Sequence, residues 1–99
     1  MYEARIILPL AGNTGASLAA VHKALAEKLV QAFGGYTAFN SWGPWKGIVE
    51  PGVTYDVACE DSFGAVRNLR TIAQWARAVA GQDAIYLRLP SGTVQFVTD

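Results

Sequence analysis

The stretch VTYDVACE, residues 53–60, alternates apolar and polar side chains without interruption. An alternation with a period of two is typical of a β-strand that has one buried face and one open face. We expect one face to carry Val53, Tyr55, Val57 and Cys59, and the opposite face to carry Thr54, Asp56, Ala58 and Glu60. The apolar face of such a strand must be covered, and the flanking sequence supplies two helices that can cover it.

Downstream of this strand, the sequence predicts a helix and two further strands. Asp61 or Ser62 can cap a helix that ends near Gly81, because apolar side chains recur between them at spacings of three and four residues. The runs AIYLRL (84–89) and TVQFV (93–97) follow as strands on either side of a PSG turn. The second run is short, so we expect it at an edge of the sheet.

The upstream half repeats the order strand, helix, strand. The run YEARIILPL (2–10) alternates as a first strand, and Ser17 is the expected N-cap of a helix that continues through Phe33. Residues 36–42, rich in aromatic and small side chains, are typical of a second strand. The segment GPWKGIVEPG (43–52) contains two pairs of Pro and Gly and is predicted to be a loop.

The resulting order is β-α-β-β-α-β with one additional strand at the end. This order predicts a single α+β domain over residues 1–99, with a ferredoxin-like antiparallel sheet, two helices on one face and a short C-terminal edge strand. Because both helices cover the same face, the opposite face is open to solvent, to a second copy or to a ligand.

Composition narrows the functional classes. Lys and Arg number 8, as do Asp and Glu, so the chain has no overall attraction to nucleic acid or to an anionic membrane. No apolar run is long enough to span a bilayer. Cys59 stands alone, so no internal disulfide is expected and a cytoplasmic location is predicted, in the host if the protein is phage-encoded.

No metal site or cofactor is expected, because His22 has no cysteine or acidic cluster near it in the sequence. A neutral chain with 52% hydrophobic residues is weakly repelled by its own copies, which favours a homo-oligomer such as a homodimer.

The open face and the neighbouring edge strand provide the candidate binding residues. By alternation, Arg5, Ile7, Asp56, Tyr86 and Arg88 point away from the helices, and Arg5, Asp56 and Arg88 can supply polar contacts to a ligand. The second strand of this topology lies at an edge, where exposed backbone groups and aromatic side chains favour contact with a partner. The predicted rim comprises Tyr36, Thr37, Asn40, Trp42, Trp45 and Lys46.

Several short motifs resemble those of a family of small uncharacterised bacterial and phage proteins. Members share an I-x-x-P strand, a helix, an F-G-G-[FY]-T motif, a G-x-W motif and a strand that carries an acid. The matching residues here are Ile6, Pro9, Asn13, Gly15, Phe33, Gly34, Gly35, Tyr36, Thr37, Gly43, Trp45 and Asp56. The resemblance implies a ferredoxin-like fold and a phage origin.

By analogy with small phage proteins, the leading hypothesis is a non-catalytic, anti-defence binding protein that blocks a host protein or sequesters a signalling nucleotide. An aromatic ring of the rim would stack on the base, and Lys46 or an arginine would bind phosphate.

Two alternatives follow from the same open face. The first is a small dimeric αβ-barrel enzyme that uses Asp56 or Glu60 as its base. The second is a structural phage component that assembles through its edge strands.

Overall fold

The computed structural model describes residues 1–45 and 48–98, and for Trp45 and Ile48 it describes the backbone alone. Within this part of the chain, one sheet has the strand order β2-β3-β1-β4-β5, and every neighbouring pair is antiparallel. The elements in chain order are β1 (Tyr2–Pro9), α1 (Ala19–Phe33), β2 (Thr37–Trp45), β3 (Ile48–Cys59), α2 (Phe63–Ala80), β4 (Ile85–Arg88) and β5 (Val94–Val97).

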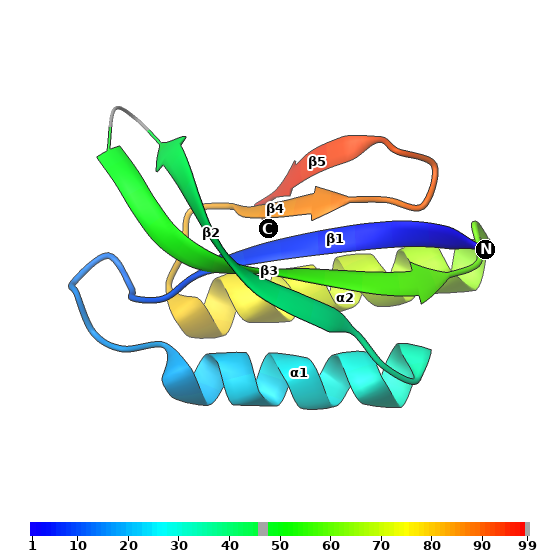
Figure 1. The fold of residues 1–99 in the computed structure, drawn as a ribbon, viewed down its shortest axis with the longest axis horizontal. Coiled ribbons are helices and arrows are strands. Elements are labelled where there is room, and N and C mark those ends of the chain that lie inside the picture. The colour runs from blue at the N-terminus through cyan, green and yellow to red at the C-terminus, as the bar shows by residue number, and fades with distance from the viewer. Residues whose placement is uncertain (46–47, 99) are drawn as a thin grey trace.

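Both helices lie on the same face of the sheet, as the sequence predicted (Figure 1). Two of the inner strands, β1 and β3, pair from Tyr2–Cys59 to Pro9–Gly52. The short strand β5 extends the sheet beyond β4, where it forms the predicted C-terminal edge. The predicted α+β class with its ferredoxin-like arrangement is therefore confirmed.

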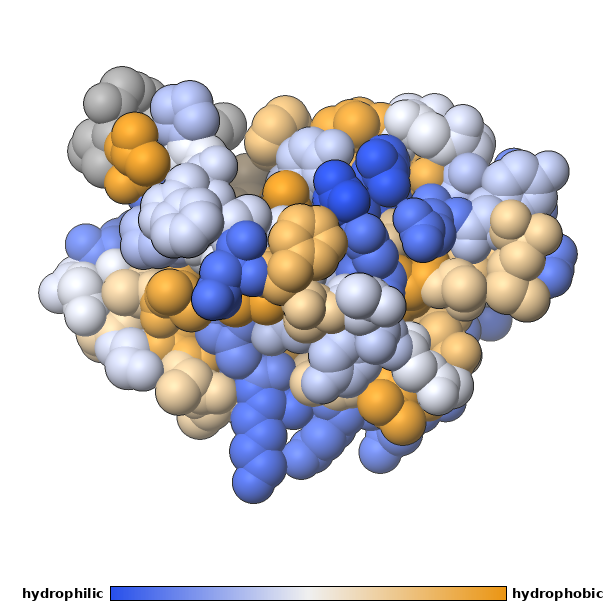
Figure 2. Space-filling view, viewed as in Figure 1, coloured by the Kyte–Doolittle hydropathy of each residue, from blue (hydrophilic) through white to orange (hydrophobic). Residues whose placement is uncertain are grey.

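The core lies between the sheet and the two helices, and the apolar face of β3 points toward it as predicted. Tyr55, Val57 and Cys59 are buried on this side, and β1 contributes alternate buried residues in the same way. The helices close the core with Leu25 and Leu69, both fully buried. Burying each such side chain stabilises the fold by about 1.5–3 kcal/mol. In Figure 2, the lower border of the molecule, where α1 lies, carries mainly hydrophilic side chains.

The helix ends agree with the sequence analysis at three of four positions. Ser62 caps α2 by accepting a hydrogen bond from the backbone N–H of Ala65 at 3.2 Å. Gly34 and Gly81 end the helices in the left-handed conformation that favours glycine. The predicted N-cap Ser17 is wrong: α1 begins one residue later, after Leu18, and the Ser17 hydroxyl accepts from the N–H of Ala19, two residues further along the chain.

The predicted loop at 43–52 is also wrong for its described residues, because β2 extends to Trp45 and β3 begins at Ile48, so that the two strands form a long hairpin; residues 46 and 47 lie outside the described part of the chain. Pairing extends from Thr37–Asp56 as far as Trp45–Ile48. Proline is tolerated here because Pro44 lies on an edge strand and Pro51 lies beyond the end of β1, so neither proline interrupts an inner ladder. The outer part of the hairpin bends away from the helices and stands above the sheet, opposite β5 (Figure 1).

Candidate functional site

A cavity of about 290 Å³ lies on the open face, between the hairpin and the β4–β5 edge. This volume is at the lower end of the range for small-molecule pockets. The hairpin reaches the cavity because β2 and β3 extend beyond the end of β1. The lining residues are Ile7, Pro9, Ser41, Trp42, Gly43, Pro44, Glu50, Pro51, Gly52, Gln82, Ala84, Tyr86 and Phe96.

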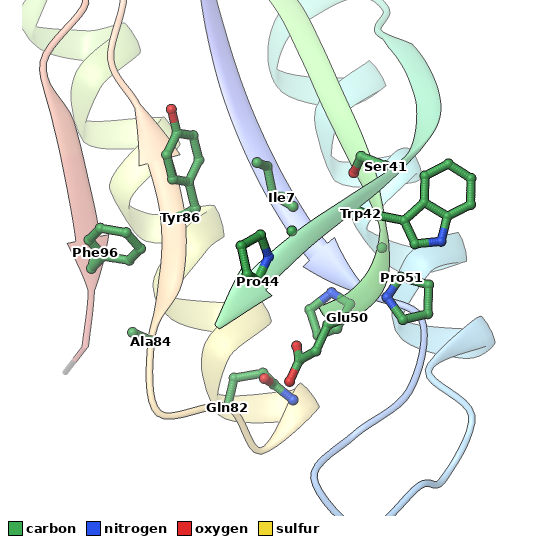
Figure 3. A pocket seen from close by; sticks show the side chains of 13 residues that line it. Ile7, Ser41, Trp42, Pro44, Glu50, Pro51, Gln82, Ala84, Tyr86 and Phe96 are labelled. Carbon is green, nitrogen blue, oxygen red and sulfur yellow. The ribbon is translucent and has the colours of Figure 1, made fainter. Parts of the chain in front are cut away.

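One wall of this pocket is aromatic. Tyr86 and Phe96 are paired across β4 and β5, and their rings meet edge to face with centroids 5.9 Å apart. Ile7 is paired with Tyr86 across β1 and β4, so it extends the apolar surface beside the Tyr86 ring. Figure 3 shows Ile7 and, from the hairpin, Pro44 between this wall and Trp42. Flat aromatic and apolar surfaces of this kind suit a planar ring such as a nucleobase.

Glu50 and Gln82 place polar side chains at the lower end of the pocket in Figure 3. Glu50 is the carboxylate among the lining residues, and its partner across β2 is Gly43, which has no side chain to cover it. A carboxylate beside mainly apolar walls can accept hydrogen bonds from sugar hydroxyls or attract a cation.

Ser41 fixes the hairpin at the edge of the pocket. Its hydroxyl oxygen accepts a hydrogen bond from the Thr54 hydroxyl at 2.8 Å, and Thr54 is buried although it belongs to the open face. Gly52 is paired with Pro9 at the end of the β1–β3 ladder. The Leu8 carbonyl oxygen lies 3.0 Å from the position that a Cβ on Gly52 would take. These close contacts set the position of β3 where it enters the hairpin.

A second polar group on the open face is the Arg5–Asp56 ion pair. The Arg5 guanidinium donates to both carboxylate oxygens of Asp56, from Nε at 2.7 Å and from Nη2 at 2.9 Å. These hydrogen bonds lower the pKa of Asp56, whereas burial opposes the shift. A carboxylate held ionised and bound on both oxygens is poorly suited to accept a proton, so the structure does not support Asp56 as a general base.

The structure does not bring the predicted site residues together in one place. Arg5, Asp56 and Arg88 share the open face but do not line the pocket. Trp42 lines it, yet its ring points away from Tyr86 and Phe96 in Figure 3 and is 71% exposed.

The other predicted rim residues do not line the pocket. Tyr36 faces the helical side, where its ring meets Tyr55 edge on at 5.6 Å. Thr37 and Asn40 are exposed on β2. Lys46 and the side chain of Trp45 lie outside the described residues.

The sequence analysis missed Glu50, Gln82 and Phe96 as site residues. Glu50 fell in the segment predicted as a loop, and Phe96 was assigned to an edge strand without a role. Ile7 and Tyr86 were placed on the correct face but were not selected. A signal was present, because both are large apolar or aromatic side chains on a face otherwise predicted to be polar.

On the helical side, His22 is held at both ring nitrogens. Its Nε2 lies 2.8 Å from the Pro9 carbonyl oxygen, and its Nδ1 lies 2.6 Å from the Tyr55 hydroxyl. A carbonyl oxygen only accepts, so Nε2 carries a proton, and in the neutral ring the Tyr55 hydroxyl donates to Nδ1. Burial raises the pKa of Tyr55 to about 12, so this hydroxyl remains a donor at neutral pH.

Across residues 1–45 and 48–98, His, Cys, Asp and Glu side chains form no group of three that could hold a metal ion. No described helix has the length and hydropathy needed to cross a membrane. Cys59 is buried, and burial raises the pKa of its thiol, which disfavours the reactive thiolate.

No protein-family model matches the chain, and no curated protein matches it. Among solved structures, a phage SAM lyase in its apo state is similar over 99% of this chain and 89% of its own, with a TM-score of 0.76 and 14% identity. A phage SAM lyase in complex with S-methyl-5'-thioadenosine covers the same shares, with a TM-score of 0.74 and 12% identity. At these identities the similarity shows a shared fold.

These matches overturn two sequence-based expectations. Both matched structures are of an enzyme, so the leading hypothesis of a non-catalytic binding protein, and with it the expectation that the chain is not an enzyme, is contradicted. The hypothesis rested on analogy with small phage proteins, which does not identify a catalytic site. It placed the binding surface at the tryptophans of the hairpin, whereas the pocket is formed largely by other residues.

Proposed function

We propose that this chain is a lyase that cleaves S-adenosylmethionine (SAM) and releases S-methyl-5'-thioadenosine. The observation that carries the proposal is the pocket on the open face, which combines an aromatic wall, apolar surfaces and one carboxylate. The shared fold with a phage SAM lyase along nearly the whole chain supports the same assignment. The phage origin implied by the sequence motifs is consistent with it.

In the proposed reaction, the bond between the sulfonium sulfur and the methionyl Cγ breaks, and its electron pair remains on sulfur. The sulfur becomes the neutral thioether of S-methyl-5'-thioadenosine. The amino-acid fragment leaves either by losing a proton from Cβ to solvent, as an unsaturated amino acid, or by closing its own carboxylate onto Cγ, as a lactone. Neither route consumes water, so the reaction is a lyase reaction in both cases.

The apolar walls favour this bond cleavage. An apolar enclosure solvates a sulfonium poorly and a neutral thioether well, so the barrier falls as the positive charge on sulfur disappears. Ile7, Pro9, Pro44, Pro51 and Phe96 provide such surfaces. The protein therefore needs no strong proton donor at the sulfur.

The remaining pocket residues bind the adenosyl group. We assign the adenine ring to the Tyr86–Phe96 wall, where aromatic stacking contributes about 1–3 kcal/mol per base. We assign the ribose hydroxyls to the Glu50 carboxylate, since a carboxylate accepts hydrogen bonds from both hydroxyls of the sugar. The ring and the sugar together would bring the sulfonium into the middle of the cavity.

The direct test is to incubate the purified protein with SAM and to identify the products by mass spectrometry. We expect S-methyl-5'-thioadenosine with either an unsaturated amino acid or a lactone. Free homoserine as the first product would indicate hydrolysis and contradict a lyase. SAM loss no faster than in buffer would contradict the proposed function altogether.

Two variants, each of which replaces a glutamate by glutamine, test the assignment of the pocket. Glu50→Gln should weaken binding of S-methyl-5'-thioadenosine by about 10- to 100-fold, since a hydrogen bond to a charged group contributes about 1.5–3 kcal/mol. Glu60→Gln is the matched control, because Glu60 is exposed beyond the opposite end of β3. Equal affinity for the two variants, measured by calorimetry, would remove Glu50 from the site.

Self-association remains part of the proposal. The edge strand β2 is exposed along most of its length, and Phe39, Trp42 and Val49 place apolar surface on the hairpin. Sedimentation should give a mass above the 10.6 kDa of one chain. A monomer at every concentration used for the activity assays would contradict this part.

A further inference from the structure

Arg88 lies next to the pocket on the open face of β4. Residues of β4 alternate between buried and half-buried, so Arg88 shares its face with Tyr86, which lines the pocket. The two residues are separated by two positions along the strand, or about 7 Å. The Arg88 side chain therefore begins one side-chain spacing beyond the aromatic wall.

The two arginines that lie side by side on the open face at this position are not equally neutralised. Arg88 is paired with Arg5 across β4 and β1, and Arg5 is paired with Asp56 across β1 and β3. Asp56 and Glu3 both stabilise the charge of Arg5, whereas Arg88 forms no ion pair with either carboxylate. Like charges directly opposite one another destabilise a sheet. A second anion at this position would remove the imbalance.

Asp56 is already occupied by Arg5, which binds both of its carboxylate oxygens. Arg88 contributes to the electrostatic stabilisation of the ionised Asp56 but makes no ion pair with it. Throughout the described residues, no hydrogen-bonded acceptor of the Arg88 guanidinium is found. A half-buried guanidinium with free donors matches the planar, bidentate geometry of a carboxylate.

We propose that Arg88 binds the carboxylate of the amino-acid part of the substrate. The inference rests on the proposed function, and it specifies how the substrate lies. The adenine is against Tyr86 and Phe96, the ribose is at Glu50, and the amino-acid chain folds back from the ribose along β4 toward Arg88. Arg88 then selects ligands that carry this carboxylate and holds the chain so that the bond between sulfur and Cγ crosses the apolar part of the pocket.

Two ligands separate this role from general binding to the pocket. S-adenosylhomocysteine carries the carboxylate and has an uncharged sulfur that is a poor leaving group, so it remains intact during a titration. S-methyl-5'-thioadenosine contains the same adenosyl group without the amino-acid chain. Arg88→Gln should weaken binding of the first ligand by about 10-fold or more and leave binding of the second unchanged.

Arg88→Lys and Arg67→Gln complete the experiment. Lysine keeps the charge but not the bidentate geometry, so Arg88→Lys should recover part of the lost affinity for S-adenosylhomocysteine. Arg67 lies on α2, where its guanidinium is over the Phe63 ring at 5.9 Å, so Arg67→Gln should bind both ligands as the wild type does.

The results distinguish failure of the inference from failure of the proposed function. If the wild type binds S-methyl-5'-thioadenosine but Arg88→Gln binds both ligands normally, the inference is overturned and the proposed function stands. An equal loss for both ligands also overturns it, because Arg88 would then support the pocket as a whole. A wild type that binds neither ligand overturns the proposed function and the inference together.

Discussion

At the scale of single residues, His22 connects the first helix to the pocket. It donates to the Pro9 carbonyl, and the N–H of the same peptide group, on Leu10, donates to the Pro51 carbonyl at 3.1 Å. Pro9 and Pro51 both line the pocket. One histidine ring on the helical side therefore helps to fix two pocket residues, although it does not line the pocket.

Replacing His22 should destabilise the fold. His22→Leu leaves the Tyr55 hydroxyl and the Pro9 carbonyl without their partner, which should lower the free energy of unfolding by about 2–4 kcal/mol in urea titrations. His22→Gln can still donate to Pro9 and should lose less than His22→Leu. Equal stability of His22→Leu and the wild type would show that water replaces both hydrogen bonds.

The Arg5–Asp56 pair predicts a dependence of stability on pH. The pKa of Asp56 is lowered in the folded state, so this carboxylate stabilises the protein fully above its unfolded pKa of about 3.9. The contribution is lost as the pH falls through the lower, folded pKa. Asp56→Asn should therefore be less stable than the wild type at pH 7 by about 1–3 kcal/mol, and the difference should shrink below about pH 4.

Asp83→Asn is the control for this pH series, because Asp83 is exposed. The difference between wild type and Asp83→Asn should stay near zero across the same range. If the stability difference between the wild type and Asp56→Asn is as large at pH 3 as at pH 7, the ion pair is not the source of that difference.

At the scale of secondary-structure elements, the hairpin depends on the close approach of β3 to β1. Gly52→Ala would place a Cβ 3.0 Å from the Leu8 carbonyl oxygen, so the backbone must shift. We expect a loss of about 1–3 kcal/mol in unfolding free energy and weaker ligand binding, since Gly52 and Pro9 both line the pocket.

The control Gly64→Ala lies in α2, where nothing is within 4 Å of the added Cβ. It should be neutral or stabilise by about 0.5–1 kcal/mol, because alanine is the better helix former. If both alanine variants unfold at the same urea concentration, the close contact between Gly52 and Leu8 does not determine the stability of the fold.

The elements also show how far the sequence was informative. Alternation in β1, β3 and β4 predicted the buried and open faces correctly, because one face of each strand packs on the helices. Proline and glycine predicted a loop at 43–52, since these signals are local. Whether proline interrupts a ladder depends on which strand lies beside it, and at Pro44 and Pro51 no inner ladder is interrupted.

At the scale of the whole molecule, the pocket could not have been predicted from the chain alone. It joins Ile7, Glu50, Gln82 and Phe96, which are far apart in sequence and belong to different elements. Their meeting depends on the length and bend of the hairpin and on the position of β5, which are properties of the assembled sheet. The local pattern instead favoured the tryptophans as site residues, but the ring of Trp42 points away from the aromatic wall.

A pocket formed by so many elements should link ligand binding to global stability. A ligand at 100 times its Kd adds about 2.7 kcal/mol to the free energy of unfolding, which raises Tm by roughly 10 °C or more in a domain of this size. S-methyl-5'-thioadenosine should therefore raise Tm in calorimetry, whereas free methionine, which lacks the adenosyl group, should have little effect. The same increase with methionine, or none with S-methyl-5'-thioadenosine, would contradict an adenosyl site between the hairpin and the β4–β5 edge.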